Sequence, residues 1–117
     1  MIFSVGSSLS ALSAFGTKMG VTSNNLANVE SQEFKKSRTL MEEGSNGNVD
    51  VEIEQVDTPG YRVLEEVDGQ LTEQELSNVD MAEEITETIP TQRGYEANLK
   101  ALKTQMEMYE SVIDTLA

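Results

Sequence analysis

The residues that could do chemistry in this chain are almost all carboxylates. Its 117 residues include 21 Asp and Glu but no His and no Cys, so an imidazole base, a thiol nucleophile and a zinc–thiolate site are excluded. Asp50, Glu52 and Glu54 could share one strand face, but their spacing is not that of a calcium-binding loop. The adjacent pairs Glu65–Glu66 and Glu83–Glu84 could suggest hydrolysis, yet neighbours in a helix point in different directions. We interpret all of them as solvated acidic faces, and we predict no catalytic residue, metal or cofactor.

The net charge of −13 excludes another large class of functions. Phosphate contacts need clustered Lys and Arg, so we expect no nucleic-acid partner, and nothing indicates a small-molecule substrate. Residues 1–41 hold 4 basic and 2 acidic residues, whereas residues 42–117 hold 4 basic and 19 acidic residues. Only 38% of the residues are hydrophobic and 5% aromatic, which predicts a thin core and a need for stabilising partners.

The first 29 residues carry a single charge, Lys18, but they are neither a membrane span nor a cleavable signal peptide. Ser, Thr and Asn interrupt every long apolar run, which argues against a span. The segment also lacks a basic start followed by a continuous apolar stretch. If the protein leaves the cytoplasm, we expect a route without a cleaved signal.

Apolar residues in this segment recur at steps of three and four, which predicts a helix with a coiled-coil seam. Gly16 and Ser23 fall on the same stripe, so neighbouring helices could approach closely there. An ordinary core helix of a small domain is the alternative. The stripe consists of Val5, Leu9, Leu12, Met19 and Leu26.

The middle segment, residues 42–76, is acidic and contains Gly and Pro. Residues 49–54 alternate between Val or Ile and Asp or Glu, which predicts a strand with one solvated face. Thr58–Gly60 indicates a tight turn, and Tyr61–Leu64 is a possible second strand. We therefore expect a short hairpin-like insert without a core of its own.

A second helix is predicted from Ser77 onward. Ser77 and Asp80 resemble a capping box, and Pro90 predicts a bend near residues 87–90. Ile85 and Ile89 extend upstream a stripe whose members are spaced by three and four without a break. That stripe consists of Gln92, Tyr95, Leu99, Leu102, Met106, Tyr109, Ile113 and Leu116.

Two pairs of motifs resemble one known family. Residues 24–29 (Asn-Asn-Leu-Ala-Asn-Val), followed by residues 34–38 (Phe-Lys-Lys-Ser-Arg), resemble the N-terminal motif of bacterial flagellar rod and hook proteins. Residues 77–84 and 92–98 resemble the C-terminal signature of the same family. Both ends match in the right order, and the chain is identified as a member of the flagellar basal body rod protein family.

The resemblance implies a mainly α fold in which long N- and C-terminal helices pack as an α-helical coiled coil around a short, acidic, β-hairpin-like insert. Residues 1–41 would form the N-terminal axial helix and turn, residues 42–76 the outward-facing insert, and residues 77–117 the C-terminal axial helix. It further implies a structural subunit of the periplasmic rod, exported by the flagellar type III apparatus without a cleaved signal peptide. Such subunits polymerise helically with copies of themselves and other axial proteins and transmit torque.

Three features depart from the family pattern. Glu33 stands where the family usually has Gly, and Pro90 replaces a good helix former. The middle segment is too short for a hook protein and shorter than that of the distal rod protein, so the chain is most like a proximal rod protein. The sequence of its C-terminal motif is more similar to that of the distal rod and hook proteins, which remain alternatives. A soluble coiled-coil export chaperone or adaptor is the alternative of another class, but it has no reason to carry both terminal motifs.

We expect the assembly surface to combine the two apolar stripes with polar residues of the motifs. The predicted interface residues are Leu9, Leu12, Met19, Asn25, Leu26, Asn28, Asn78, Val79, Gln92, Arg93, Tyr95, Asn98, Leu99, Leu102, Met106, Tyr109, Ile113 and Leu116.

Overall fold

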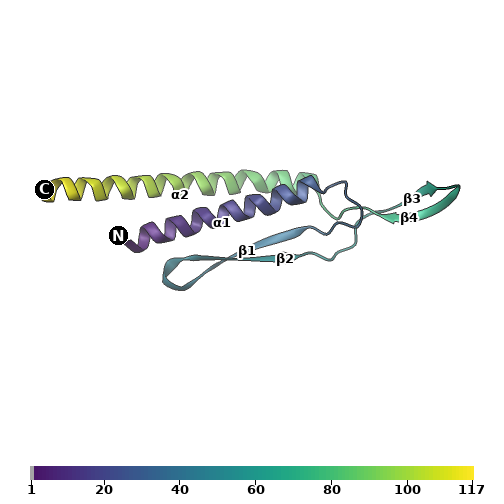
Figure 1. Cartoon of the computed structure of the whole chain (residues 1–117), viewed down its shortest axis with the longest axis horizontal. Helices are drawn as coiled ribbons and strands as arrows, with labels where there is room; N and C mark the ends of the chain where they lie inside the picture. Colours follow the sequence, from purple (N-terminus) through teal and green to yellow (C-terminus); the bar gives the residue numbers. More distant parts are fainter. Residues whose placement is uncertain (1) are drawn as a thin grey trace.

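The computed structural model describes residues 2–117 as an elongated body of 81 × 23 × 18 Å (Figure 1). Two long helices run side by side, a first hairpin lies along one of them, and a second hairpin projects from one end of the body. In chain order the elements are α1 (Ile2–Ala27), β1 (Ser37–Glu43), the 3₁₀ turn η1 (Ser45–Gly47), β2 (Val49–Gln55), β3 (Arg62–Val67), β4 (Gln70–Glu75) and α2 (Met81–Leu116).

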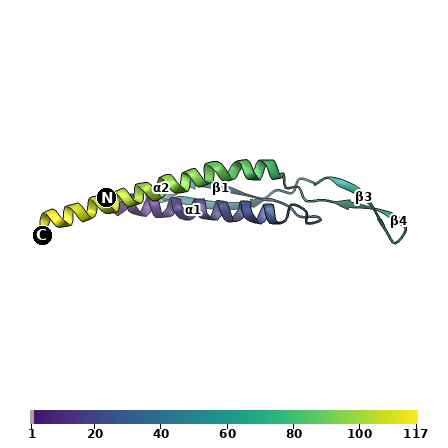
Figure 2. The same cartoon turned by 90° about the horizontal axis from the view of Figure 1, so that it is seen from above.

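The two helices are antiparallel and differ in length. α1 has 26 residues and α2 has 36, so the last turns of α2 extend beyond the start of α1 (Figures 1 and 2). Contacts along the pair confirm the direction. Ser8 near the start of α1 lies within 3.4 Å of Gln105 Oε1, whereas Lys18 further along is paired with Glu87 of α2.

The predicted coiled coil is wrong, because the helices meet through small and polar residues. Phe15 of α1 packs on Gly94 of α2, where an added Cβ would lie 2.5 Å from the ring. Ala11 of α1 and Thr91 of α2 are buried, whereas the stripe residue Met106 is 59% exposed. Because Gly94 has no Cβ, α1 packs closely against a face of α2 that lies beside the apolar stripe. The stripe therefore lies on the flank of the helix pair.

The middle of the chain forms two separate two-stranded antiparallel sheets, not one hairpin-like insert, so the predicted fold class is corrected here as well. The predicted strand at residues 49–54 is confirmed as β2. Its partner is β1, in register from Ser37 opposite Gln55 to Glu43 opposite Val49. The possible strand at residues 61–64 instead begins β3, which pairs with β4. The division of the chain at residues 41 and 76 stays a prediction, and β1 lies across the first of these boundaries.

The β1–β2 hairpin packs along α1 and not on α2. Its clearest anchor is Ser10, whose hydroxyl accepts a hydrogen bond from Val49 N at 2.8 Å and lies 3.1 Å from Val49 O. Ser37, Thr39 and Met41 alternate with more exposed residues along β1, as expected for a strand with one covered face. α1 is thus contacted by α2 on one side and by the hairpin on another.

The β3–β4 hairpin carries its residues largely in solvent (Figure 1). Its turn is made by Asp68 and Gly69, both with positive φ (53° and 79°). Asp-Gly is a preferred sequence for the two-residue turn whose twist matches that of the flanking strands. The turn therefore accounts for the hairpin without any packing against the helices.

The start of α2 differs from the sequence prediction by one turn. Asp80 is the N-cap, and its carboxylate accepts hydrogen bonds from Ala82 N and Glu83 N at 2.9 and 3.2 Å. The Ser77 hydroxyl, three residues before this N-cap, instead accepts from Val79 N. Both residues are good N-cap types, so composition alone did not separate them.

Pro90 lies inside α2, and the helix continues through it without a break. Its missing N–H removes the bond that the Thr86 carbonyl would accept, but the Thr91 hydroxyl donates to Glu87 O at 2.8 Å. That side-chain bond supports the backbone next to the proline. Among the residues described, no helix is both long enough and apolar enough to cross a membrane.

Replacing Pro90 by Ala should stabilise the folded chain. The substitution restores a helical N–H and removes the ring, so the free energy of unfolding should rise by up to about 3 kcal/mol. Denaturant titration followed by circular dichroism measures the change. Pro59→Ala, in the loop before β3, is the matched control and should lower stability slightly, because only the unfolded chain gains freedom. Equal effects of the two substitutions would contradict a strained helix at Pro90.

Candidate assembly surface

The apolar stripes of α1 and α2 lie next to each other and form a groove on the flank of the helix pair. Its volume is about 1060 Å³, and most of its lining is apolar. Six of the predicted interface residues line it together with Val5: Leu9, Leu99, Leu102, Met106, Tyr109 and Ile113. We call this the apolar groove.

A second, smaller hollow of about 300 Å³ follows further along the same two helices. It contains three more predicted residues, Met19, Gln92 and Tyr95, beside Phe15. The Gln92 amide also donates to Glu96 at 3.1 Å on the exposed side of α2. The stripes thus continue as one surface along most of the helix pair.

The groove is open to solvent. Leu99 is 48% exposed and Ile113 is 64% exposed, and Leu116 on the overhanging end of α2 is 82% exposed. Leu12 and Leu26 of α1 are partly buried. Contiguous apolar surface of this kind on a small chain marks a site of interaction with another protein.

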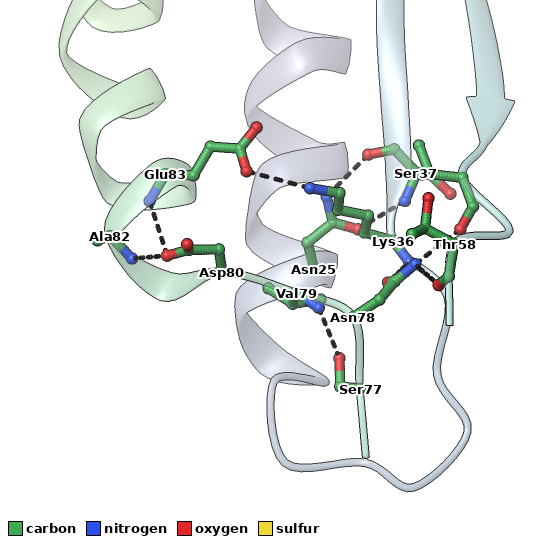
Figure 3. Close-up of polar contacts among 11 residues, drawn as sticks. Asn25, Lys36, Ser37, Thr58, Ser77, Asn78, Val79, Asp80, Ala82 and Glu83 are labelled. Carbon is green, nitrogen blue, oxygen red and sulfur yellow. Dashed lines mark hydrogen bonds and ion pairs between the residues drawn. The ribbon is translucent and has the colours of Figure 1, made fainter. Parts of the chain in front are cut away.

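The predicted amide residues have a different place, at the junction where α1, the first hairpin and α2 meet (Figure 3). Asn25 is 1% exposed. Its side chain donates to Ser37 O at 2.8 Å and accepts from Ser37 N at 3.0 Å. Asn25 therefore bonds to the first residue of β1 as a neighbouring strand would, and it fixes the hairpin to α1.

Asn78, in the segment just before α2, also fixes the first hairpin by side-chain hydrogen bonds (Figure 3). Its side-chain oxygen accepts from Lys36 N at 2.6 Å, and its amide donates to Val56 O and Thr58 O at 2.8 and 2.9 Å. Lys36 and Val56 flank the base of the first hairpin, where Val56 N donates to Lys36 O. The residues before α2 thus close the hairpin that follows α1.

The remaining predicted residues are spread over the two helices. Asn28 directly follows α1 and donates from its side chain to Asn24 O at 2.9 Å. Asn98 bonds back to Gly94 O at 2.8 Å, and Val79 is partly buried at the junction. Arg93 is exposed on α2. The structure therefore brings six of the predicted residues together in the groove and places Asn25 and Asn78 in hydrogen bonds within the subunit.

An ion pair that sequence reasoning missed holds the second hairpin to this junction. The Glu75 carboxylate bonds to Lys35 Nζ and accepts from Gly60 N at 3.0 Å. The hydrogen bond from Lys35, followed by that from Gly60, lowers the pKa of Glu75 below its ordinary value of 4.5. Only a signal linking residues 40 positions apart could have revealed this pair.

Glu33 shows how the junction accommodates a departure from the family pattern. Its φ is 58°, the left-handed conformation for which glycine is the usual residue, so the turn keeps a glycine-like backbone at a cost of about 1–2 kcal/mol. The Glu33 N–H donates to Glu75 O at 3.0 Å, which helps to hold that conformation.

The acidic residues singled out from the sequence do not converge. Asp50 stands opposite Glu42, and Glu52 opposite Leu40, in the β1–β2 register. Within residues 2–117, the structure brings no three Asp or Glu side chains together as metal ligands.

Asn25→Ala should destabilise the subunit by about 2 kcal/mol, because it leaves the buried N–H and C=O of Ser37 without partners. The free energy of unfolding from denaturant titration gives the size of the effect. The matched control is Asn24→Ala at the neighbouring exposed position, which should change stability by less than about 0.5 kcal/mol. A loss no larger for Asn25 than for Asn24 would remove Asn25 from the fixation of the hairpin.

The Glu75 contacts should make stability depend on pH. Because the pKa of Glu75 is lowered in the folded state, its contribution is present above pH 4.5 and is lost as the pH falls through the folded pKa. Glu75→Gln should therefore be less stable than the wild type at pH 7, and the gap should close in strong acid. Thermal unfolding from pH 2 to pH 7 measures it, and a gap that stays constant over this range would contradict the ion pair.

Comparison with known families connects this architecture to a cellular structure. Residues 72–115 match the family model described as flagellar basal body rod FlgEFG protein C-terminal, and residues 7–35 match the model described as flagella basal body rod protein. Together the matches cover more than half of the chain, including most of both helices and both junction amides. None of the curated proteins matches the chain. The family suggested by the two terminal motifs is thereby confirmed, and the chain belongs to the flagellar basal body rod proteins.

Proposed function

We propose that this chain is a structural subunit that polymerises helically, with copies of itself and with other axial proteins, into the torque-transmitting rod of the basal body. The observation that carries the proposal is the apolar groove, which both helices build and neither covers. Burying such a surface against a neighbour supplies the main favourable term in association. The subunit is therefore incomplete by itself.

The composition of the groove fits a lasting contact between proteins. It is lined mostly by apolar side chains, including Tyr109 and Met106, and also by the charged residues Lys103, Glu107 and Glu110. Stable interfaces usually combine an apolar surface with polar residues around it. Most acidic residues lie elsewhere, on the hairpins and at the two ends of α2.

The elongated shape supports polymerisation and not closure into a dimer. The groove lies near the free end of the helix pair, whereas the β3–β4 hairpin projects from the opposite end (Figure 1). Contacts between different patches on successive copies generate a filament whenever the rotation between copies does not close. In such a tube torque is carried by the contact area between neighbours, with no chemical step.

The middle segment supports a place in the proximal part of the rod. Between α1 and α2 the chain forms only two small hairpins and their connections, with no outer domain. We further propose that the subunit reaches the periplasmic rod through the flagellar type III apparatus without a cleaved signal peptide. The uncharged, Ser- and Gly-rich start of α1 lacks the features of a cleavable signal.

A carboxylate in the groove tests the proposal. Leu102 lines the groove, and Leu102→Asp would bury an unpaired charge in every contact of the tube, a cost of several kcal/mol per subunit. In a bacterial strain lacking this chain, the variant should be secreted but give no complete rod and no swimming. Motility assays, immunoblots of secreted protein and electron microscopy of basal bodies report these three outcomes.

Thr104→Asp is the matched control. Thr104 is exposed and, two residues further along the helix, faces away from Leu102, so this variant should swim normally. Normal swimming of Leu102→Asp would remove the groove from assembly. Complete rods in a non-motile Leu102→Asp strain would show that Leu102 is needed at a step other than rod assembly.

A further inference from the structure

The apolar groove contains a side chain that a small reagent can modify. Met106 lines the groove and is 59% exposed, so a reagent dissolved in water can reach it in the single subunit. Leu102, one turn before it, and Tyr109, one turn after it, line the groove on the same face of α2. The other methionines that the structure describes lie outside this lining, namely Met19, Met41, Met81 and Met108.

The composition of the chain directs oxidation to its methionines. The 117 residues contain no Cys and no Trp, so no thiol of the chain consumes an oxidant before the thioethers do. A thioether is oxidised to a sulfoxide, and exposure decides which methionines react. The sequence also supplies no thiol that could reduce the sulfoxide again. Reversal of the modification therefore depends on a separate reductase.

The reaction is the transfer of one oxygen atom from a peroxide to sulfur. A lone pair of the Met106 sulfur attacks one oxygen of hydrogen peroxide, and the S–O bond forms as the O–O bond breaks. The proton of the transferred hydroxyl passes to the departing hydroxide, which leaves as water. The sulfur is oxidised by two electrons and the peroxide is reduced by two. No other side chain of the protein is needed for this step.

The sulfoxide lacks the property on which the groove depends. It is polar, whereas the thioether is apolar, and its oxygen accepts hydrogen bonds. Most of the lining is apolar, and the ionised carboxylates of Glu107 and Glu110 have no hydrogen to donate. Lys103, the cation of the lining, is paired with Glu107 at 4.0 Å. A neighbour that covered the groove would bury the sulfoxide oxygen mainly against apolar side chains, which costs free energy.

We propose that Met106 is a modification site, and that oxidation of its side chain to the sulfoxide by a peroxide keeps an unassembled subunit out of the filament. The inference rests on the proposed function, because it requires a neighbour that covers the groove. In the single subunit the side chain is open to the oxidant, whereas in the filament the neighbour covers it. Oxidised subunits are thereby excluded, and assembled subunits are protected.

The test compares the purified full-length chain before and after treatment with hydrogen peroxide. Peptide mass spectrometry measures oxidation at each methionine, and sedimentation over a range of concentrations measures self-association. The oxidised wild type should self-associate about tenfold more weakly, as expected when a polar group is buried with few partners. Methionine sulfoxide reductases that act on both sulfoxide epimers should restore the association.

Met106→Leu and Met108→Leu form a matched pair of variants. Met108 is 50% exposed, which is comparable to Met106, but it lies two residues further along α2 on a different face and does not line the groove. Both substitutions keep an apolar side chain of similar volume, so the untreated variants should associate as the wild type does. After treatment with peroxide, Met106→Leu should keep its association, whereas Met108→Leu should lose it as the wild type does.

Several outcomes would overturn the proposal. Loss of association by treated Met106→Leu would place the effect at another residue, and a Met106 that stays unmodified while Met108 is oxidised would show that the reagent does not reach it. A lower melting temperature of the dilute oxidised chain would attribute the weaker association to unfolding. If oxidation of Met106 leaves the association of the wild type unchanged, this inference fails although the proposed polymerisation stands. An untreated wild type that remains monomeric at every concentration would contradict the proposed polymerisation, and this inference with it.

Discussion

The contact of Phe15 with Gly94 is the constraint on which the arrangement of the two helices depends. Because Gly94 has no Cβ, the ring lies directly over the backbone of α2 and brings α1 close. Small residues such as Ala11 fill the remaining narrow space. The larger side chains of both apolar stripes do not fit between the helices and lie along the flank. The exposed groove thus follows from the close approach of the helices, and not from a shortage of apolar residues.

At the junction, two amide side chains take the place of backbone hydrogen-bond partners. Asn25 bonds both the N–H and the C=O of Ser37, and Asn78 bonds three backbone groups at the base of the same hairpin. A side-chain amide offers donors and an acceptor in one plane, which matches the needs of a strand end. The N- and C-terminal motifs, about 50 residues apart, therefore meet in one hydrogen-bonded unit. Their residue types have a role within the subunit before any neighbour is considered.

Sequence periodicity predicted the helices, their stripes and β2, because each of these depends on residues close together in the chain. Periodicity did not predict the features that depend on contacts between residues far apart in the sequence. The stripes showed which faces are apolar, but the contact between α1 and α2 also includes Ser8, Thr91 and Gly94, which carry no hydrophobic signal. β1 was missed because its pattern is weak, and it is fixed by bonds from Ser10 and Asn25 to the hairpin. The groove residues could be listed in advance, whereas the Lys35–Glu75 ion pair required the fold.

The energetics of the isolated subunit favour coupling between its order and its assembly. Among the described side chains, Ala11 and Ala14 are the apolar ones that are buried. Because apolar burial stabilises a fold by roughly 25 cal/mol per Å² and these side chains are small, the core contributes little to the stability of the subunit. The last turn of α2, which ends at Leu116, extends beyond the start of α1 and depends on helix propensity. A neighbour in the groove would cover Ile113, in the turn before. Contact with the next subunit therefore supplies apolar burial where the single chain lacks it, which makes the far end of α2 the part whose order depends most on the filament.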